Sequence, residues 1–171
     1  PAPGPANDLC TAAQPLFDGG TTQQLVASTG LANNETSGTA CASGVAPDLY
    51  YQFTTDQPQW FTAQVTPSAD AGFSPALLLT PLSACGSSGG AALSNLRGCA
   101  TSGFPGDPAT LQVPALDAGT WLLVVDGRNG TSGAFTLDVS LTTAQPTPSN
   151  GDCSGPLTVT LAPGPLVSRA V

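Results

Sequence analysis

Short stretches with an apolar residue at every second position recur through this chain of 171 residues. In the clearest of them, Phe135–Leu141, Phe, Leu, Val and Leu alternate with Thr, Asp and Ser, and Leu49–Phe53 and Phe61–Val65 follow the same pattern. Because successive side chains of a strand point to opposite faces, this period predicts strands with one buried face. Two continuous apolar runs, Pro75–Leu79 and Thr120–Val125, predict strands that are covered on both faces.

The intervening segments are rich in turn residues, with 20 Gly and 17 Pro in the whole chain, and no stretch has the period of an amphipathic helix. Asp126–Gly130 holds residues that tolerate a positive φ, which predicts a hairpin connection between the last two strands of the domain. We therefore expect an all-β fold. It should be a jelly-roll or Ig-like β-sandwich of about seven or eight antiparallel strands, with an extra C-terminal strand.

Charge and residue usage exclude several functions. Eleven acids against three Arg and no Lys give a net charge of −8, which argues against nucleic-acid binding. The chain has no His and so lacks the usual general base, nucleophile activator and zinc ligand. Residues 86–90, Gly-Ser-Ser-Gly-Gly, match the G-x-S-x-G nucleophile motif only formally, because that motif needs a histidine partner. We predict that the protein is not an enzyme.

The sequence also indicates a compartment. No stretch approaches the roughly 20 apolar residues of a membrane-spanning helix, so no membrane insertion is expected. Residues 1–5 read Pro-Ala-Pro-Gly-Pro without a Met, which predicts the mature form of a protein whose signal peptide has been removed. We expect a secreted, extracellular protein at the cell surface.

Four of the five cysteines, Cys10, Cys41, Cys85 and Cys99, lie in polar, Gly- and Ser-rich surroundings without the spacing of a metal site. Such cysteines predict two disulfides and an oxidising compartment. Sequence alone permits three connectivities, and we expect the pairs Cys10–Cys41 and Cys85–Cys99. The remaining Cys153 would form an intermolecular bridge or stay a buried thiol.

The chain has the organisation of one complete repeat followed by the start of another. Asn-Asp-Leu-Cys at residues 7–10 is echoed by Asn-Gly-Asp-Cys at residues 150–153. A Pro- and Thr-rich linker lies before the second motif. The expected divisions are a Pro-rich extension over residues 1–6, the β-sandwich over 7–141, the linker over 142–149 and a tail over 150–171.

Four segments resemble the bacterial pre-peptidase C-terminal domain. They are Asn-Asp at residues 7–8, Asp-Leu-Tyr-Tyr-Gln-Phe at 48–53, Leu-Asp-Ala-Gly-Thr-Trp-Leu-Leu-Val-Val-Asp-Gly at 116–127 and Gly-Ala-Phe-Thr-Leu-Asp-Val at 133–139. The likeness covers about residues 7–141, and the cysteines resemble those of a repeat variant in secreted bacterial proteins. It implies a jelly-roll-like β-sandwich that is often accessory to a secreted enzyme and sometimes binds fibrous protein or polysaccharide.

Some members of that family bind calcium, and the resemblance implies a site at Asn7, Asp8 and Asp48. The Glu residues that relatives supply there are missing from this chain, whereas calcium takes six to eight oxygen ligands. The alternative is a structural role, with Asp48 in a turn and Asp8 solvated or capping the backbone. No other cofactor is expected.

Aromatic residues offer two further expectations. Tyr50 and Tyr51 must point to opposite faces of their strand, so we expect only one of them in the core. Trp60 and Trp121 are expected to fill the sandwich core rather than to form an exposed platform for carbohydrate.

The tail gives the sharpest functional hypothesis. Its predicted assembly strand comprises Leu157, Val159, Leu161, Leu166 and Val167, together with Cys153. The alternation over residues 157–161 predicts a strand that is donated to the sheet of another copy, which would build a fibre or filament. The alternative is that the same tail is the start of a second repeat.

We therefore expect a non-enzymatic extracellular structural protein whose partners are other copies of itself. The alternative is an accessory module of a larger secreted protein, similar to the pre-peptidase C-terminal domain, that binds polysaccharide or fibrous protein.

Overall fold

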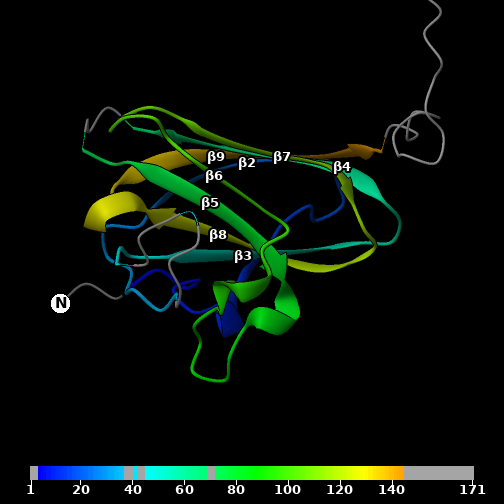
Figure 1. Cartoon of the computed structure of the whole chain (residues 1–171), viewed down its shortest axis with the longest axis horizontal. Coiled ribbons are helices and arrows are strands. Elements are labelled where there is room, and N and C mark those ends of the chain that lie inside the picture. Colours follow the sequence, from blue (N-terminus) through cyan, green and yellow to red (C-terminus); the bar gives the residue numbers. More distant parts are fainter. Residues whose placement is uncertain (1–3, 37–40, 42–44, 69–71, 145–171) are drawn as a thin grey trace, which may run out of the picture.

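The computed structural model of the protein describes residues 4–36, 41, 45–68 and 72–144. Within these residues the chain forms nine β-strands and four short 3-10 turns, with no α-helix. Figure 1 shows the strands in two layers, with β2, β4, β7 and β9 in one layer and β3, β5 and β8 in the other.

The five-stranded sheet contains, in spatial order, β1 (Gln14–Pro15), β3 (Leu49–Thr55), β8 (Gly119–Gly127), β5 (Pro75–Pro81) and β6 (Gly98–Thr101). The four-stranded sheet contains β2 (Thr22–Ser28), β9 (Ala134–Thr143), β4 (Gln59–Pro67) and β7 (Ala109–Leu116). The turns are η1 (Cys10–Ala12), η2 (Leu82–Ala84), η3 (Leu93–Asn95) and η4 (Arg128–Gly130). Neighbouring strands are antiparallel, except that β1 runs parallel to β3. The all-β sandwich expected from the sequence is confirmed.

The main core lies between the two sheets. In β9 every second residue from Phe135 to Leu141 is buried, as the alternation predicts. In β4 the side chain of Phe61 is fully buried and stacks on Phe53 of β3, with ring centroids 4.7 Å apart. Burying one such side chain stabilises the fold by about 1.5–3 kcal/mol, so these alternating residues hold the sheets together.

The five-stranded sheet is also covered on its outer face, by the N-terminal segment and the β5–β6 loop (Figure 1). This second core consists of Cys10, Ala13, Tyr50, Ala76, Leu78, Ala91, Leu93, Leu122 and Val124. β5 and β8 are therefore buried on both faces, as their continuous apolar runs predict. The expectation that only one of Tyr50 and Tyr51 belongs to the core was wrong. Tyr51 packs in the main core and Tyr50 in the second, and both are fully buried.

Two other local expectations need correction. Trp121 is buried in the main core, but Trp60 is only half-buried, because it alternates with the buried Phe61 and so lies on the outer face of β4. The connection from β8 to β9 is not a hairpin, since the two strands belong to different sheets. Asn129 and Gly130 do have positive φ angles, of 54° and 75°, as the residue types in this turn predict.

The four cysteines form two disulfides, but the expected pairing was wrong. Cys10 is bonded to Cys85 and Cys41 to Cys99, with Cα–Cα distances of 5.7 and 6.2 Å. The reason is topological. β6 runs back along β5 and carries Cys99 into the sheet, whereas Cys85 stays in the loop where the Cys10 backbone N–H donates to the Gly89 carbonyl at 2.7 Å.

The disulfides place this domain in an oxidising compartment, extracellular or periplasmic. No helix among the described residues is long and apolar enough to cross a membrane. The predicted assembly strand, with Leu157, Val159, Leu161, Leu166 and Val167, lies outside the described residues, and so does Cys153.

Candidate functional site

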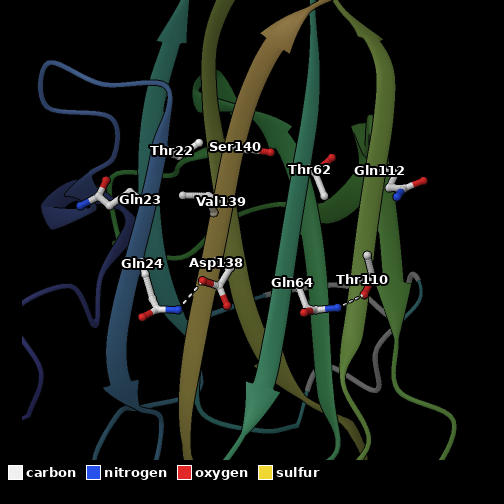
Figure 2. A pocket seen from close by; sticks show the side chains of 10 residues that line it. All are labelled: Thr22, Gln23, Gln24, Thr62, Gln64, Thr110, Gln112, Asp138, Val139 and Ser140. Carbon is white, nitrogen blue, oxygen red and sulfur yellow. Dashed lines mark hydrogen bonds between the residues drawn. The ribbon is translucent and has the colours of Figure 1, made fainter.

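The outer face of the four-stranded sheet is hollowed into an open groove of about 690 Å³. Figure 2 shows its side chains in two rows across β2, β9, β4 and β7. The first row is Thr22, Ser140, Thr62 and Gln112, and the second is Gln24, Asp138, Gln64 and Thr110. Gln23 and Val139 complete the lining. Apart from Asp138, no described residue that lines the groove carries a charge.

Strand alternation creates this polar face. In β4, Thr62 and Gln64 stand between residues that are buried in the main core, and Asp138 and Ser140 do so in β9. Neighbouring strands lie about 4.8 Å apart, so each row presents a polar group roughly every 5 Å. The pattern therefore suits a ligand that is itself polar along its length.

Two hydrogen bonds orient side chains in the groove. Gln24 Nε2 donates to Asp138 Oδ1 at 2.6 Å, and Gln64 Nε2 donates to Thr110 Oγ1 at 2.9 Å. Each bond engages one N–H and fixes the orientation of an amide, a group that both donates and accepts. The groove thus combines positioned amides with hydroxyl groups, which also donate and accept.

An aromatic side chain flanks the rows. Trp60 lies two residues before Thr62 on β4, on the same outer face, and its Cα partner on β9 is Thr142. Its half-buried side chain thus lies on the face of the sheet that carries the groove, next to the lining residue Thr62 along the face. Trp60 was expected in the core, so its position on the groove face was missed.

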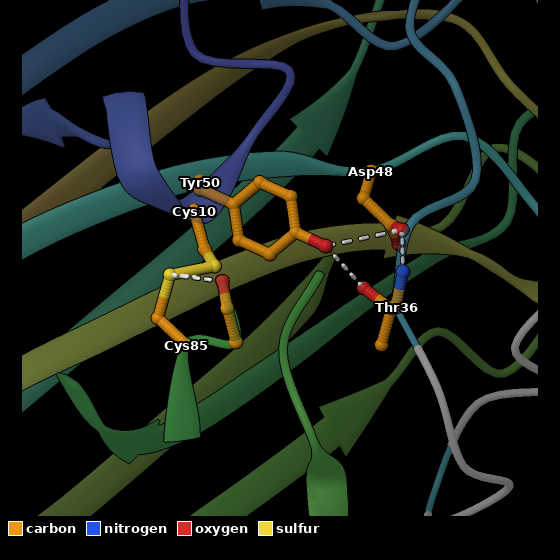
Figure 3. Close-up of a disulfide and its surroundings, with 6 residues drawn as sticks. Cys10, Thr36, Asp48, Tyr50 and Cys85 are labelled. Carbon is orange, nitrogen blue, oxygen red and sulfur yellow. Dashed lines mark hydrogen bonds between the residues drawn. A yellow bond between two sulfur atoms is a disulfide. The ribbon is translucent and has the colours of Figure 1, made fainter. Parts of the chain in front are cut away.

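A second polar cluster is buried beside the Cys10–Cys85 disulfide (Figure 3). Asp48 is fully buried, and its Oδ2 accepts the backbone N–H groups of Glu35 at 2.9 Å and Thr36 at 2.7 Å. Thr36 Oγ1 lies 2.9 Å from Tyr50 Oη, and the Tyr50 hydroxyl donates to Asp48 Oδ2 at 3.4 Å. The cluster fastens the segment around Thr36 to β3.

Asp126 of β8 joins this cluster and is also fully buried. Its Oδ1 accepts the Gly127 backbone N–H at 2.6 Å, and its backbone lies opposite that of Asp48, because Leu49 of β3 pairs with Val125 of β8. Burial, reinforced by the Asp48 carboxylate, raises the pKa of Asp126 to about 8, and burial also raises the pKa of Asp48. Asp48 Oδ1 and Asp126 Oδ2 have no hydrogen-bond partner within the described part of the chain. The raised pKa of Asp126 means that its carboxyl keeps a proton at a pH where an exposed Asp has lost it.

The residues implied for calcium have protein partners instead. Asn7 Nδ2 donates to the Tyr50 carbonyl at 3.1 Å, and both oxygens of Asp8 accept from Asn33, at 2.6 and 2.5 Å. Asp48 faces the buried cluster described above. In the described ranges no group of three or more His, Cys, Asp or Glu side chains gathers in the manner of a metal site. As they stand, the three residues do not assemble the six to eight oxygens that calcium takes, and calcium binding there stays a prediction.

Among known proteins, the chain is similar to solved structures and not to any family model or curated sequence. One similar solved structure is the pre-peptidase C-terminal domain of a Bacillus anthracis collagenase, with 14% identity, a TM-score of 0.48, and coverage of 82% of this chain and 99% of that one. Another is PliG of Aeromonas hydrophila, a periplasmic inhibitor of g-type lysozyme, with 16% identity, a TM-score of 0.48, and coverage of 76% and 96%.

Proposed function

We propose that this chain is a non-catalytic accessory domain of an exported protein and that it binds a neutral polysaccharide in the groove of the four-stranded sheet. The observation that carries the proposal is the groove itself, with its two rows of hydroxyl and amide side chains and a tryptophan at its flank. A polysaccharide presents hydroxyl groups along its length and sugar rings that stack on aromatic faces. The groove offers partners for the hydroxyl groups, and Trp60, on the same face of β4, is the candidate for stacking with a sugar ring.

Charge favours a neutral polymer over an acidic one. The chain has a net charge of −8, and the groove contains a carboxylate, Asp138, but no basic residue within the described part of the chain. The negative charge of the chain would repel a polyanion, and the described groove residues include no cation that could pair with it. Uncharged hydroxyl and amide groups also cost less to desolvate than charged groups do.

Removing the groove amides should abolish most of this binding. We expect Gln64→Ala combined with Gln112→Ala to weaken binding about tenfold or more, since each lost hydrogen bond contributes about 0.5–1.5 kcal/mol. Native electrophoresis of the full chain in gels that contain hydroxyethyl cellulose, a neutral β-glucan or the acidic polymer alginate measures this as retardation. The matched control is Gln57→Ala, which removes an exposed glutamine from the β3–β4 turn.

The expected pattern is retardation in at least one neutral gel, none in alginate, loss in the double variant and no change in Gln57→Ala. Migration that is unaffected by every neutral polymer would contradict the proposal. Equal retardation of the double variant and the wild type would show that any binding lies elsewhere.

Self-assembly is the second candidate function, in which residues 157–161 are donated to a neighbouring copy to form a filament. The observation that favours it is the low charge of the whole chain, 8% Asp, Glu, Lys and Arg, combined with the alternating apolar pattern of this segment. Copies with few charged side chains lose little hydration energy when they pack together.

A further inference from the structure

Within residues 4–36, 41, 45–68 and 72–144, one edge of the sandwich is unprotected. β2 is the outermost strand of the four-stranded sheet, and its register with β9 runs without a bulge from Thr22 to Ser28. Its sequence, Thr-Gln-Gln-Leu-Val-Ala-Ser, contains no charge and no Pro. Natural edge strands usually carry such features to prevent strand addition. The opposite edge has them, because β7 contains Pro114 and shifts register against β4.

Among the residues that the structure describes, no strand pairs with the outer edge of β2, so its backbone is available to a further strand. The Leu141 N–H donates to the Thr21 carbonyl at 2.7 Å, so the odd-numbered residues of β2 form the hydrogen bonds to β9. Hydrogen-bonding groups alternate along a strand, and the N–H and C=O groups of Thr22, Gln24 and Val26 therefore point to the free edge. The Val26 side chain is 80% exposed on the outer face.

The core is also open along this edge. The partly buried apolar residues that pack against the main core are Phe17, Leu25, Ala27, Ala32 and Ala100. All except Ala100 border β2. Leu25 and Ala27 lie on its inner face, Ala32 is in the turn that follows it, and the Phe17 N–H donates to the Gln23 side chain at 2.8 Å. An added strand would complete the core if its inner face were apolar and its outer face polar.

We propose that β2 accepts residues 157–161 of another copy as a fifth strand, a proposal that rests on the self-assembly named above as the second candidate function. The segment Leu-Thr-Val-Thr-Leu has the required alternation. Leu157, Val159 and Leu161 would cover the open core, and Thr158 and Thr160 would extend the polar face of the groove.

Length and composition support this occupant. The five residues of the segment fit within the seven-residue length of β2, and neither segment carries a charge that pairing would bury. The described chain ends at Ala144, after β9, and 12 residues separate it from Leu157. Pro146 and Pro148 in this connection favour an extended chain.

Two blocking variants of the full chain test the proposal. Val26→Pro removes an N–H from the free edge without removing a bond to β9, and Val159→Asp places a charge on the inner face of the donated segment. Val26→Thr and Thr158→Asp are the matched controls, because they keep the edge N–H and place the charge on the outer face. All proteins carry Cys153→Ser so that no intermolecular disulfide contributes, and thermal unfolding checks that each is folded.

Sedimentation velocity over a range of concentrations gives the result. We expect the wild type and both controls to form species that grow with concentration, and Val26→Pro and Val159→Asp to stay monomeric when alone. Their equimolar mixture should form dimers that grow no further, because one variant keeps the donor and the other keeps the edge.

A wild type that is monomeric at every concentration would overturn self-assembly itself. Growth of Val26→Pro alone would overturn the β2 edge as acceptor while self-assembly stands, and growth of Val159→Asp alone would overturn the segment as donor. A mixture without dimers would also contradict the proposal.

Discussion

Replacing Asp126 with Asn is expected to stabilise the protein at alkaline pH and to flatten its stability profile. The folded protein holds the Asp126 proton up to a pH of about 8, whereas an unfolded Asp releases it near pH 4. This contribution to stability is therefore fully present below about pH 4 and is lost as the pH rises towards 8. An Asn at this position has no proton to lose, and its amide can donate to Asp48.

Thermal unfolding between pH 4 and pH 9 measures this effect. At pH 9 we expect Asp126→Asn to gain about 2–3 kcal/mol over the wild type, or roughly 5–10 °C in Tm. Asp56→Asn removes the same charge from an exposed position in the β3–β4 turn, so the difference between the variants isolates the effect of burial. Parallel profiles for Asp126→Asn and the wild type would contradict the raised pKa of Asp126.

Removing the Cys10–Cys85 disulfide should cause the largest loss of stability. The bond closes a segment with a sequence separation of 75, and loop entropy alone predicts a loss of about 4 kcal/mol. Cys10 is 2% exposed and belongs to the second core, so its replacement also disturbs packing against Tyr50 and its neighbours. We expect Cys10→Ala combined with Cys85→Ala to lower Tm by roughly 10 °C.

The second disulfide supplies the control. Cys41–Cys99 has a similar sequence separation of 58, but both of its residues are exposed. Its double Ala variant should therefore lose only the loop-entropy contribution to the free energy of unfolding. It should unfold at a higher temperature than the Cys10 and Cys85 double variant. The opposite order in differential scanning calorimetry would show that the second core contributes little.

The strands with strong patterns were predictable from the sequence, and the arrangement of the chain around them was not. Phe135–Leu141 alternates because one face of β9 lies against the main core, and Pro75–Leu79 is continuous because β5 is buried on both faces. Contacts between distant segments determine which sheet contains β9 and which cysteine pairs with Cys10. Periodicity carries no information about these contacts, which is why the hairpin and the disulfide pairing were wrong.

The sequence pattern predicted the candidate groove only in part. The alternation indicated that Thr62, Gln64, Asp138 and Ser140 face outward, but it could not show that β4 and β9 are neighbours in one sheet. The buried position of Asp126 was hidden for a related reason. A carboxylate in a Gly-containing turn segment ordinarily faces solvent, and only the fold brings it beside Asp48.

The most direct test of the proposed function is amide chemical-shift mapping of the full ¹⁵N-labelled chain, titrated with the neutral polysaccharide that retards it most in the gel. The prediction is that the largest changes fall on β2, β9, β4 and β7, around Gln64 and Gln112, and that Trp60 Nε1–H shifts with them. Changes confined to the loops or to the five-stranded sheet, or no changes at saturating polymer, would contradict the groove as the binding site.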